Sequence, residues 1–249
     1  MNRRTIFSSG ITLAALAPLL VLPGNLQAGP PLICHALNIG EARSLPWAAT
    51  PGSAHWSSAM ADYDLRQLAG DTLALLSPQT PVIVRMETLR RAAIYAQKDP
   101  YVAKELLMKL RQRAFDSEAN GRPDALAWFD YGYLAECYKQ TAWMPGKHGA
   151  GSDRESSAGS ELAASIDGYA AVEKAIRLRG PAADTPQMEF AAALIGLEGP
   201  KPGQQEHGRK AVAAASHDPL LAENLATHFL GDRSDAVSTI LTKTTTAKN

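Results

Sequence analysis

Cys34 and His35 are adjacent, and they form the sharpest chemical signal in the chain. A thiolate and an imidazole can together ligate a metal ion or haem, or act as a redox site. Covalent haem attachment needs a second cysteine upstream, at the position where Pro31 stands. A zinc site needs three or four ligands at characteristic spacing, and no such set accompanies this pair. Metal or redox chemistry at Cys34 and His35 is therefore an alternative to a structural role.

The structural role would be a disulfide bond. The chain contains two cysteines, Cys34 and Cys137. In an oxidising compartment an even pair most simply forms one bond, which would contribute roughly 3–5 kcal/mol to stability. We expect this disulfide to join the segment around Cys34 to a helix that carries Cys137.

The other histidines and the glycine-rich stretch give weaker signals. His207, His217 and His228 lack the four-residue spacing that places two imidazoles on one helical face. Residues 146–152 contain several glycines, but no Lys-Ser/Thr pair follows them as a phosphate-binding loop requires. These patterns predict no catalytic residue, no metal ligand and no cofactor, and they give no reason to expect an enzyme.

One predicted helix carries an acid, Asp130, close in sequence to three aromatic residues, Trp128, Tyr131 and Tyr133. Aromatic side chains beside a carboxylate suit contact with a peptide or a sugar, so these four are candidate groove residues. The alternative is that the aromatic side chains pack helices against one another inside the core.

The charge balance excludes one class of partner. The chain has 25 basic and 25 acidic residues, and removal of residues 1–28 takes away two arginines and no acid, which leaves 23 − 25 = −2. A near-neutral protein has no general attraction for phosphate backbones, so we expect no nucleic-acid binding.

We expect Glu87, Arg90 and Arg91 to lie on a solvent-exposed helix face.

Residues 1–28 have the layout of an export signal. Arg3 and Arg4 precede an apolar run over residues 11–22, and Ala28 offers a small residue for cleavage. The run is about 12 residues long, whereas a membrane-spanning helix needs ~20. We therefore expect a periplasmic or secreted protein without a membrane span in the mature chain. The paired arginines leave the general and the twin-arginine export routes both open.

The mature chain divides by composition. Residues 29–58 contain Pro, Gly and Trp without a helical period, which predicts an irregular arm that packs onto the body. Residues 59–231 form the predicted helical domain, interrupted at 141–160 by a flexible Gly/Ser-rich insertion. Residues 232–249 are a polar tail that we expect to be disordered. The absence of two-residue alternation predicts an all-α fold.

Apolar spacing and helix-start residues predict individual helices. Apolar residues recur every three or four positions over 82–96, where Thr80 is the expected N-cap. Asp99, Asp124 and Asp218 each stand beside a proline and mark further helix starts. A stripe over 162–176 predicts one continuous helix.

Part of this helical pattern resembles the tetratricopeptide repeat family. The segment Gly168–Leu178 is similar to the second helix of such a repeat, and Trp128 and Gly132 have the spacing of the bulky and small positions of the first helix. Tyr131 and Ala135 depart from the pattern, because the family usually has leucine and a large aromatic residue there.

The resemblance covers residues 122–231 and implies antiparallel helix pairs stacked as a solenoid. An irregular helical bundle is the alternative. Members of this family usually bind proteins or peptides along a concave face, so the resemblance implies an unknown protein or peptide partner. The leading expectation is an exported interaction protein. The alternatives are a redox or metal-binding protein using Cys34 and His35, and a helical enzyme without a recognisable motif.

Overall fold

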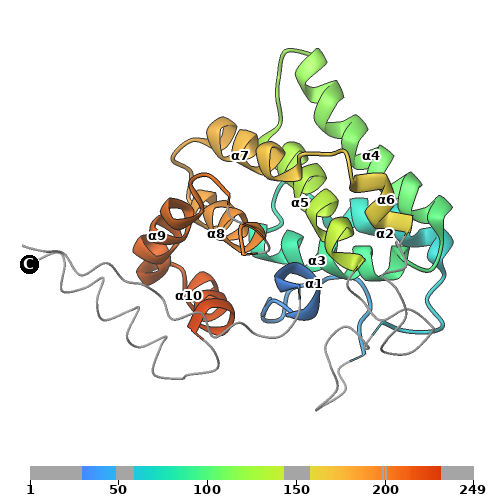
Figure 1. Cartoon of the computed structure of the whole chain (residues 1–249), viewed down its shortest axis with the longest axis horizontal. Helices are drawn as coiled ribbons and strands as arrows, with labels where there is room; N and C mark the ends of the chain where they lie inside the picture. The colour runs from blue at the N-terminus through green and yellow to red at the C-terminus, as the bar shows by residue number, and fades with distance from the viewer. Residues whose placement is uncertain (1–29, 49–58, 143–157, 198, 200, 231–249) are drawn as a thin grey trace, which may run out of the picture.

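The computed structural model of the chain describes residues 30–48, 59–142, 158–197, 199 and 201–230 (Figure 1). The described residues form α-helices, 3₁₀ turns and one π turn, and they contain no β-strand, which confirms the all-α prediction. None of the described helices combines the length and apolar character needed to cross a membrane. The predicted signal peptide, the predicted tail 232–249 and most of the predicted insertion 141–160 lie outside the described residues.

The helices follow one another in the order α1 (Pro31–Cys34), α2 (Leu68–Leu75), α3 (Val82–Ala96), α4 (Pro100–Ala119), α5 (Ala125–Thr141), α6 (Ala158–Ala163), α7 (Gly168–Arg179), α8 (Thr185–Ile195), α9 (Gln204–Ala214) and α10 (Pro219–Leu225). A 3₁₀ turn, Leu65–Gln67, leads into α2, and another, Ala215–His217, joins α9 to α10. A π-helical turn, Ala226–Leu230, extends α10.

Helix α5 is the centre of the molecule. It contacts α1, α3, α4, α6, α7 and α8, and its residues are buried around nearly the whole circumference. A helix whose apolar side chains extend around its circumference has to be covered on most sides, and its buried polar side chains, such as Asp130 and Gln140, then need partners inside the protein. In Figure 1, α5 accordingly lies between α7 and α6, with α3 below it. Helix α8 is a second hub, in contact with α7, α9 and α10.

Aspartate caps begin several of the helices. Asp99 accepts a hydrogen bond from the Tyr101 amide at 2.8 Å, and Asp124 accepts one from the Leu126 amide at 2.8 Å. Asp218 caps α10 in the same way. These bonds satisfy amides that have no partner within the helix, which confirms the three predicted starts.

Two details of the sequence-based prediction are wrong. Thr80 does not cap α3, because its hydroxyl donates to the carbonyl of Leu75 instead. The stripe over 162–176 is divided between α6 and α7, and Ala164 to Asp167 form the break. Asp167 caps α7 by accepting a hydrogen bond from the Ala170 amide at 2.9 Å. A capping aspartate thus ends the continuity that periodicity alone suggested.

The described part of the N-terminal arm packs onto the helices, as predicted. Leu32, Ile33 and Leu37 are buried in the core, and residues 31–34 form one short helical turn. The amide of Leu32 donates to Gln140 on α5 at 2.7 Å, and the hydroxyl of Tyr95 donates to the carbonyl of Pro46 at 2.6 Å. Side chains of the body therefore bind the backbone of an arm that has little secondary structure of its own.

A buried group of charges on α3 holds the same arm. Glu87 accepts hydrogen bonds from the Leu37 amide at 3.0 Å and from both Arg90 and Arg91. Arg90 also donates to the carbonyl of Ile33 at 2.9 Å. Burial alone would raise the pKa of Glu87, but the two arginines hold it below its ordinary value.

The expectation that Glu87, Arg90 and Arg91 face solvent is therefore wrong. The side chains of Glu87 and Arg90 are fully buried, and that of Arg91 is 16% exposed. Burial of these charges is tolerated because each meets an opposite charge or a backbone group of the arm.

The arm also reaches the far end of the described chain. The amide of Asn38 donates to Asn224 on α10 at 2.9 Å, and the side-chain amide of Asn224 donates back to the Asn38 carbonyl at 2.8 Å. Figure 1 shows α1, in blue, in the region between α3 and α10. The first and last described segments are thus joined directly.

Helices α5 and α7 cross at two glycines. A Cβ atom added at Gly132 would lie 2.6 Å from the carbonyl oxygen of Gly168 and 2.8 Å from the Cβ of Ala171. Both distances are far below van der Waals contact, and the first partner is backbone that cannot rotate away. Gly132 therefore sets how closely these two helices approach.

We expect Gly132→Ala to destabilise the protein by about 2 kcal/mol or more, because the added methyl group forces the two helices apart. The free energy of unfolding from urea denaturation measures the effect.

Gly70→Ala is the matched control. Gly70 lies within α2, where an added Cβ meets nothing within 4 Å. Alanine there should stabilise the helix by about 0.5–1 kcal/mol. Equal effects of the two substitutions would show that the α5–α7 crossing does not depend on close approach.

Candidate functional site

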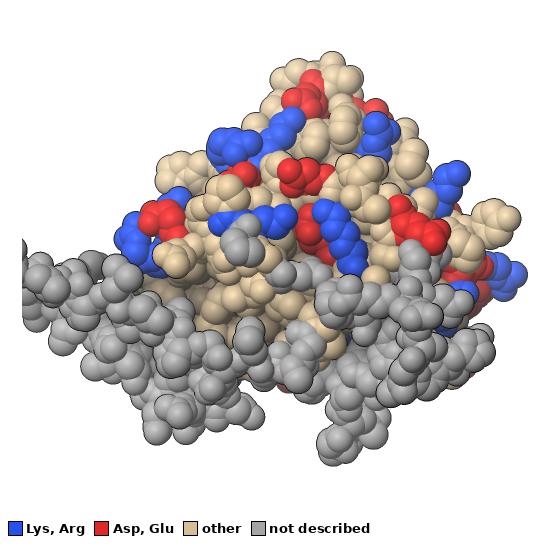
Figure 2. Space-filling view, viewed as in Figure 1, with Lys and Arg blue, Asp and Glu red and all other residues tan. Residues whose placement is uncertain are grey.

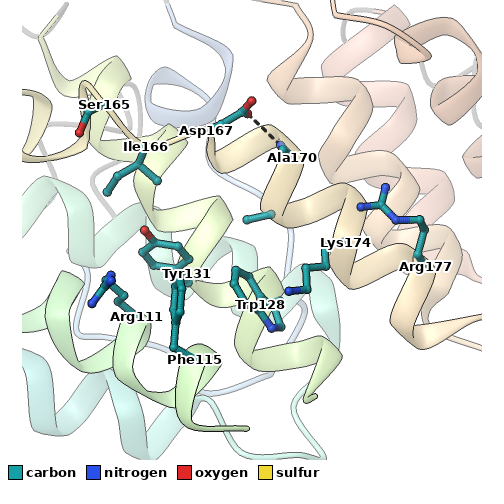
Figure 3. A pocket seen from close by; sticks show the side chains of 11 residues that line it. Arg111, Phe115, Trp128, Tyr131, Ser165, Ile166, Asp167, Ala170, Lys174 and Arg177 are labelled. Carbon is teal, nitrogen blue, oxygen red and sulfur yellow. Dashed lines mark hydrogen bonds between the residues drawn. The ribbon is translucent and has the colours of Figure 1, made fainter. Parts of the chain in front are cut away.

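An open groove lies between α4, α5 and α7 and has a cavity volume of about 510 Å³. Figure 3 shows its lining, with side chains from all three helices and from the link between α6 and α7. The cationic and aromatic side chains of this lining are Arg111 and Phe115 from α4, Trp128 and Tyr131 from α5, and Lys174 and Arg177 from α7.

The wall of the groove is a cluster of three aromatic rings. The ring centroid of Phe115 lies 4.9 Å from that of Trp128 and 6.1 Å from that of Tyr131. Trp128 and Tyr131 are themselves 6.2 Å apart in an edge-to-face arrangement. Each is 6% exposed, whereas Phe115 is 40% exposed. Phe115 is therefore the aromatic ring of this cluster with the largest area open to a partner.

Cations flank the aromatic cluster on two sides. The guanidinium of Arg111 lies 4.5 Å from the Phe115 ring centroid, and the ammonium of Lys174 lies 3.7 Å from that of Trp128. Lys174 also donates to both carboxylate oxygens of Glu118 at 2.7 Å. In Figure 3, Arg111 stands at one end of the cluster, and Lys174 and Arg177 stand at the other. The groove thus combines apolar rings with positive charge at both ends.

Two of the four candidate groove residues lie on this groove and two do not. Trp128 and Tyr131 line it. Asp130 and Tyr133 project from other sides of α5 and are fully buried. Tyr133 stacks on Phe129 with a centroid separation of 5.6 Å, so it is a packing aromatic residue.

Asp130 forms a buried ion pair with Arg85 of α3 at 2.6 Å. Arg85 also donates to the backbone carbonyls of Thr80 and Ser77. Burial raises the pKa of Asp130 to about 6, although Arg85 and Arg113 favour its charged form. This carboxylate therefore links α5 to the segment before α3 and takes no part in the groove.

Cys34 and Cys137 are both free in this structure, so the predicted disulfide is absent from it. The two thiols differ in environment, since Cys137 is fully buried on α5 and Cys34 ends the short helix α1 at an intermediate position. Burial raises the pKa of both thiols, and Arg90 opposes it in each case. A raised pKa lowers the thiolate fraction that metal binding or redox exchange requires.

His35 lies beside His228, the last of the three C-terminal histidines. The two ring centroids are 6.2 Å apart in an edge-to-face arrangement, and Phe190 packs 5.7 Å from His228 on another side. The Nδ1 of His228 donates to the Asn224 carbonyl at 2.9 Å. Burial lowers the pKa of His228 to about 4, and that hydrogen bond only partly opposes the shift. His228 is therefore neutral at physiological pH.

His207 lies elsewhere, between α8 and α9. Its Nδ1 pairs with Glu189, and its ring packs edge-to-face against Tyr169 at 6.0 Å. Lys210 contacts the other oxygen of Glu189 at 3.1 Å. Across residues 30–48, 59–142 and the later described stretches, no three His, Cys, Asp or Glu side chains are arranged to hold a metal ion.

Charges of both signs are interspersed on the face shown in Figure 2. This distribution agrees with the balanced composition of 25 basic and 25 acidic residues. Local arrangements such as the groove, rather than a large field of one sign, therefore decide where charged partners are attracted.

Sequence reasoning missed Arg111, Phe115, Lys174 and Arg177 as groove residues. They lie on α4 and α7, outside the helix that carries Trp128, and meet it only in the folded structure. One usable signal was present, because Phe115 falls outside the apolar stripe Val102, Leu106, Leu110 and Ala114 that α4 buries. An aromatic residue next to a buried stripe is a candidate for surface contact.

The pKa of His228 gives a pH prediction. Its ordinary value of 6.5 applies to the unfolded chain, so between pH 4 and 6.5 the unfolded state binds more protons than the native state. The lowered pKa of His228 therefore reduces the free energy of unfolding as the pH falls from 6.5 towards 4, by up to about 3 kcal/mol, and has no such effect above pH 6.5. Asp130 acts in the opposite sense, because its raised pKa destabilises the native state as the pH rises from 3.8 to about 6.

We therefore expect wild-type stability to change little between pH 4 and 6, and the His228→Asn variant to become less stable as the pH rises over that range. Asparagine keeps a donor near the Nδ1 position but does not titrate. Urea denaturation across this range measures both proteins. Parallel curves for the two proteins would contradict the assigned titration of His228.

No family model, curated protein or solved structure matches the chain. The resemblance to tetratricopeptide repeats therefore stays a prediction.

Proposed function

We propose that the protein is an exported interaction protein whose groove between α4, α5 and α7 binds an extended peptide segment of a partner protein. The observation that carries the proposal is the aromatic cluster in an open groove, with Phe115 40% exposed at its edge. Interface residues that dominate binding are enriched in tryptophan, tyrosine and arginine, and these types gather here around Trp128, Tyr131 and Arg111.

The shape of the groove favours a chain segment over a small molecule. Small-molecule sites are usually enclosed and bury most of the ligand surface, whereas this groove is broadly open. An extended peptide can lie along such a groove and contact it through successive side chains. The resemblance of residues 122–231 to a peptide-binding repeat family also supports the proposal.

Export remains part of the proposal on the strength of residues 1–28. Arg3, Arg4, the apolar run and Ala28 together have the order of a signal peptide.

Selection from a random peptide-display library against the full chain tests the groove. We expect enriched peptides whose affinity falls at least about tenfold in Phe115→Ala, because that change removes the most exposed ring of the groove. Fluorescence anisotropy of labelled synthetic peptides measures the dissociation constants.

Tyr101→Ala is the control for this experiment. Tyr101 lies on the same helix, is 84% exposed and does not line the groove. Its replacement should leave the affinity unchanged. A library that yields no binder, or binders that lose affinity equally in both variants, would contradict the proposed site.

Export is tested by expressing the full chain in a bacterial host and measuring the intact mass of the protein in each compartment. We expect a periplasmic or secreted form that has lost residues 1–28. A full-length protein confined to the cytosol would contradict this part of the proposal.

A further inference from the structure

The two arginines of the groove have no carboxylate partner among the residues that the structure describes. Arg111 and Arg177 are both exposed, and neither forms an ion pair with a described residue. Their neighbours differ in this respect, because Lys174 is bound to Glu118 and Arg179 is bound to Asp184 at 2.8 Å. The groove therefore carries guanidinium groups whose donors are available to a ligand.

Arg111 is also held in position before any ligand arrives. Its guanidinium lies 4.5 Å from the Phe115 ring centroid, and its positive charge interacts favourably with the hydroxyl of Tyr131. These contacts use part of the planar group and leave other N–H donors free. A side chain that is already oriented loses less conformational freedom on binding, which favours affinity.

The other charged residues of the groove do not cancel the positive charge of Arg111 and Arg177. The groove lining has three cations, Arg111, Lys174 and Arg177, and one carboxylate, Asp167, and the carboxylate of Glu118 neutralises Lys174. Asp167 is engaged as the cap of α7, where it accepts a hydrogen bond from the Ala170 amide (Figure 3). The local charge is thus positive on a protein whose overall composition is balanced.

We propose that the groove selects an acidic peptide segment, in which carboxylates bind Arg111 and Arg177 while an apolar or aromatic side chain between them packs on Phe115. This inference rests on the proposed function and adds the chemistry of the partner to it. Guanidinium and carboxylate groups match in geometry and form paired, charge-assisted hydrogen bonds. The two arginines stand at opposite ends of the aromatic cluster in Figure 3, so carboxylates must flank the apolar side chain.

The test uses the full chain and three labelled synthetic peptides of equal length. The acidic peptide has a central tyrosine flanked by glutamates, and the other two carry glutamine or lysine in place of every glutamate. We expect the acidic peptide to bind roughly tenfold more tightly than the glutamine peptide, and the lysine peptide to bind most weakly. The affinity of the acidic peptide should fall as salt is raised, because the contacts are partly exposed.

Arg111→Gln combined with Arg177→Gln should remove the preference for glutamate over glutamine. The variant should keep the affinity of the glutamine peptide, because the aromatic cluster remains. Arg43→Gln makes the same change of charge at an exposed arginine of the N-terminal arm, outside the groove, and should preserve the preference.

The outcomes separate this inference from the proposed function. Equal affinities for the three peptides, each lowered by Phe115→Ala, would overturn the acidic preference and leave peptide binding in place. A preference that persists in the double arginine variant would overturn the assignment of Arg111 and Arg177. Failure of every peptide here and of the display library would overturn the groove itself.

Discussion

Helix α5 is buried on nearly every side, and this constraint determines how the other helices are arranged. Each face of α5 has to be covered by a different neighbour, with α3 and α4 on some sides and α6 and α7 on others. The glycine crossing at Gly132 lets α7 approach closely. The groove exists because α4 and α7 both pack on α5 near Trp128 but leave an open space between them there. The candidate site is thus a consequence of how a central helix is enclosed.

Charges, rather than a covalent link, attach the N-terminal arm in this structure. Glu87, Arg90 and Arg91 bind its backbone from a buried position, and Gln140 adds a further contact. Such a network is costly to desolvate but very selective, because a carboxylate or guanidinium without its partner would be left uncompensated in the interior. The position of the arm is therefore the one in which Glu87, Arg90 and Arg91 meet their partners on its backbone.

The sequence predicted best those helices that bury a single stripe. Helix α4 buries one stripe, which includes Leu106, Leu110 and Ala114, and aspartates begin α4, α5 and α10 as their local chemistry requires. Helix α3 follows its three-to-four spacing but is buried on nearly every side, so the spacing did not reveal that Glu87 and Arg90 are buried. Periodicity failed on α5, where Trp128 and Asp130 carry similar local signals but face the groove and the core respectively. It also missed the break at Asp167. The partners of Trp128 come from distant segments, and no local pattern encodes which helices meet.

The reciprocal hydrogen bonds between Asn38 and Asn224 have a consequence for how the molecule loses its structure. In a linear array of repeats each unit touches only its neighbours, so the ends can melt while the middle persists. Here the first and last described segments are fastened to each other, and the chain closes into a ring of contacts. Neither the N-terminal arm nor α10 can therefore fray independently of the other. Denaturation should consequently be a single all-or-none transition, with the arm and α10 released together with the helices between them.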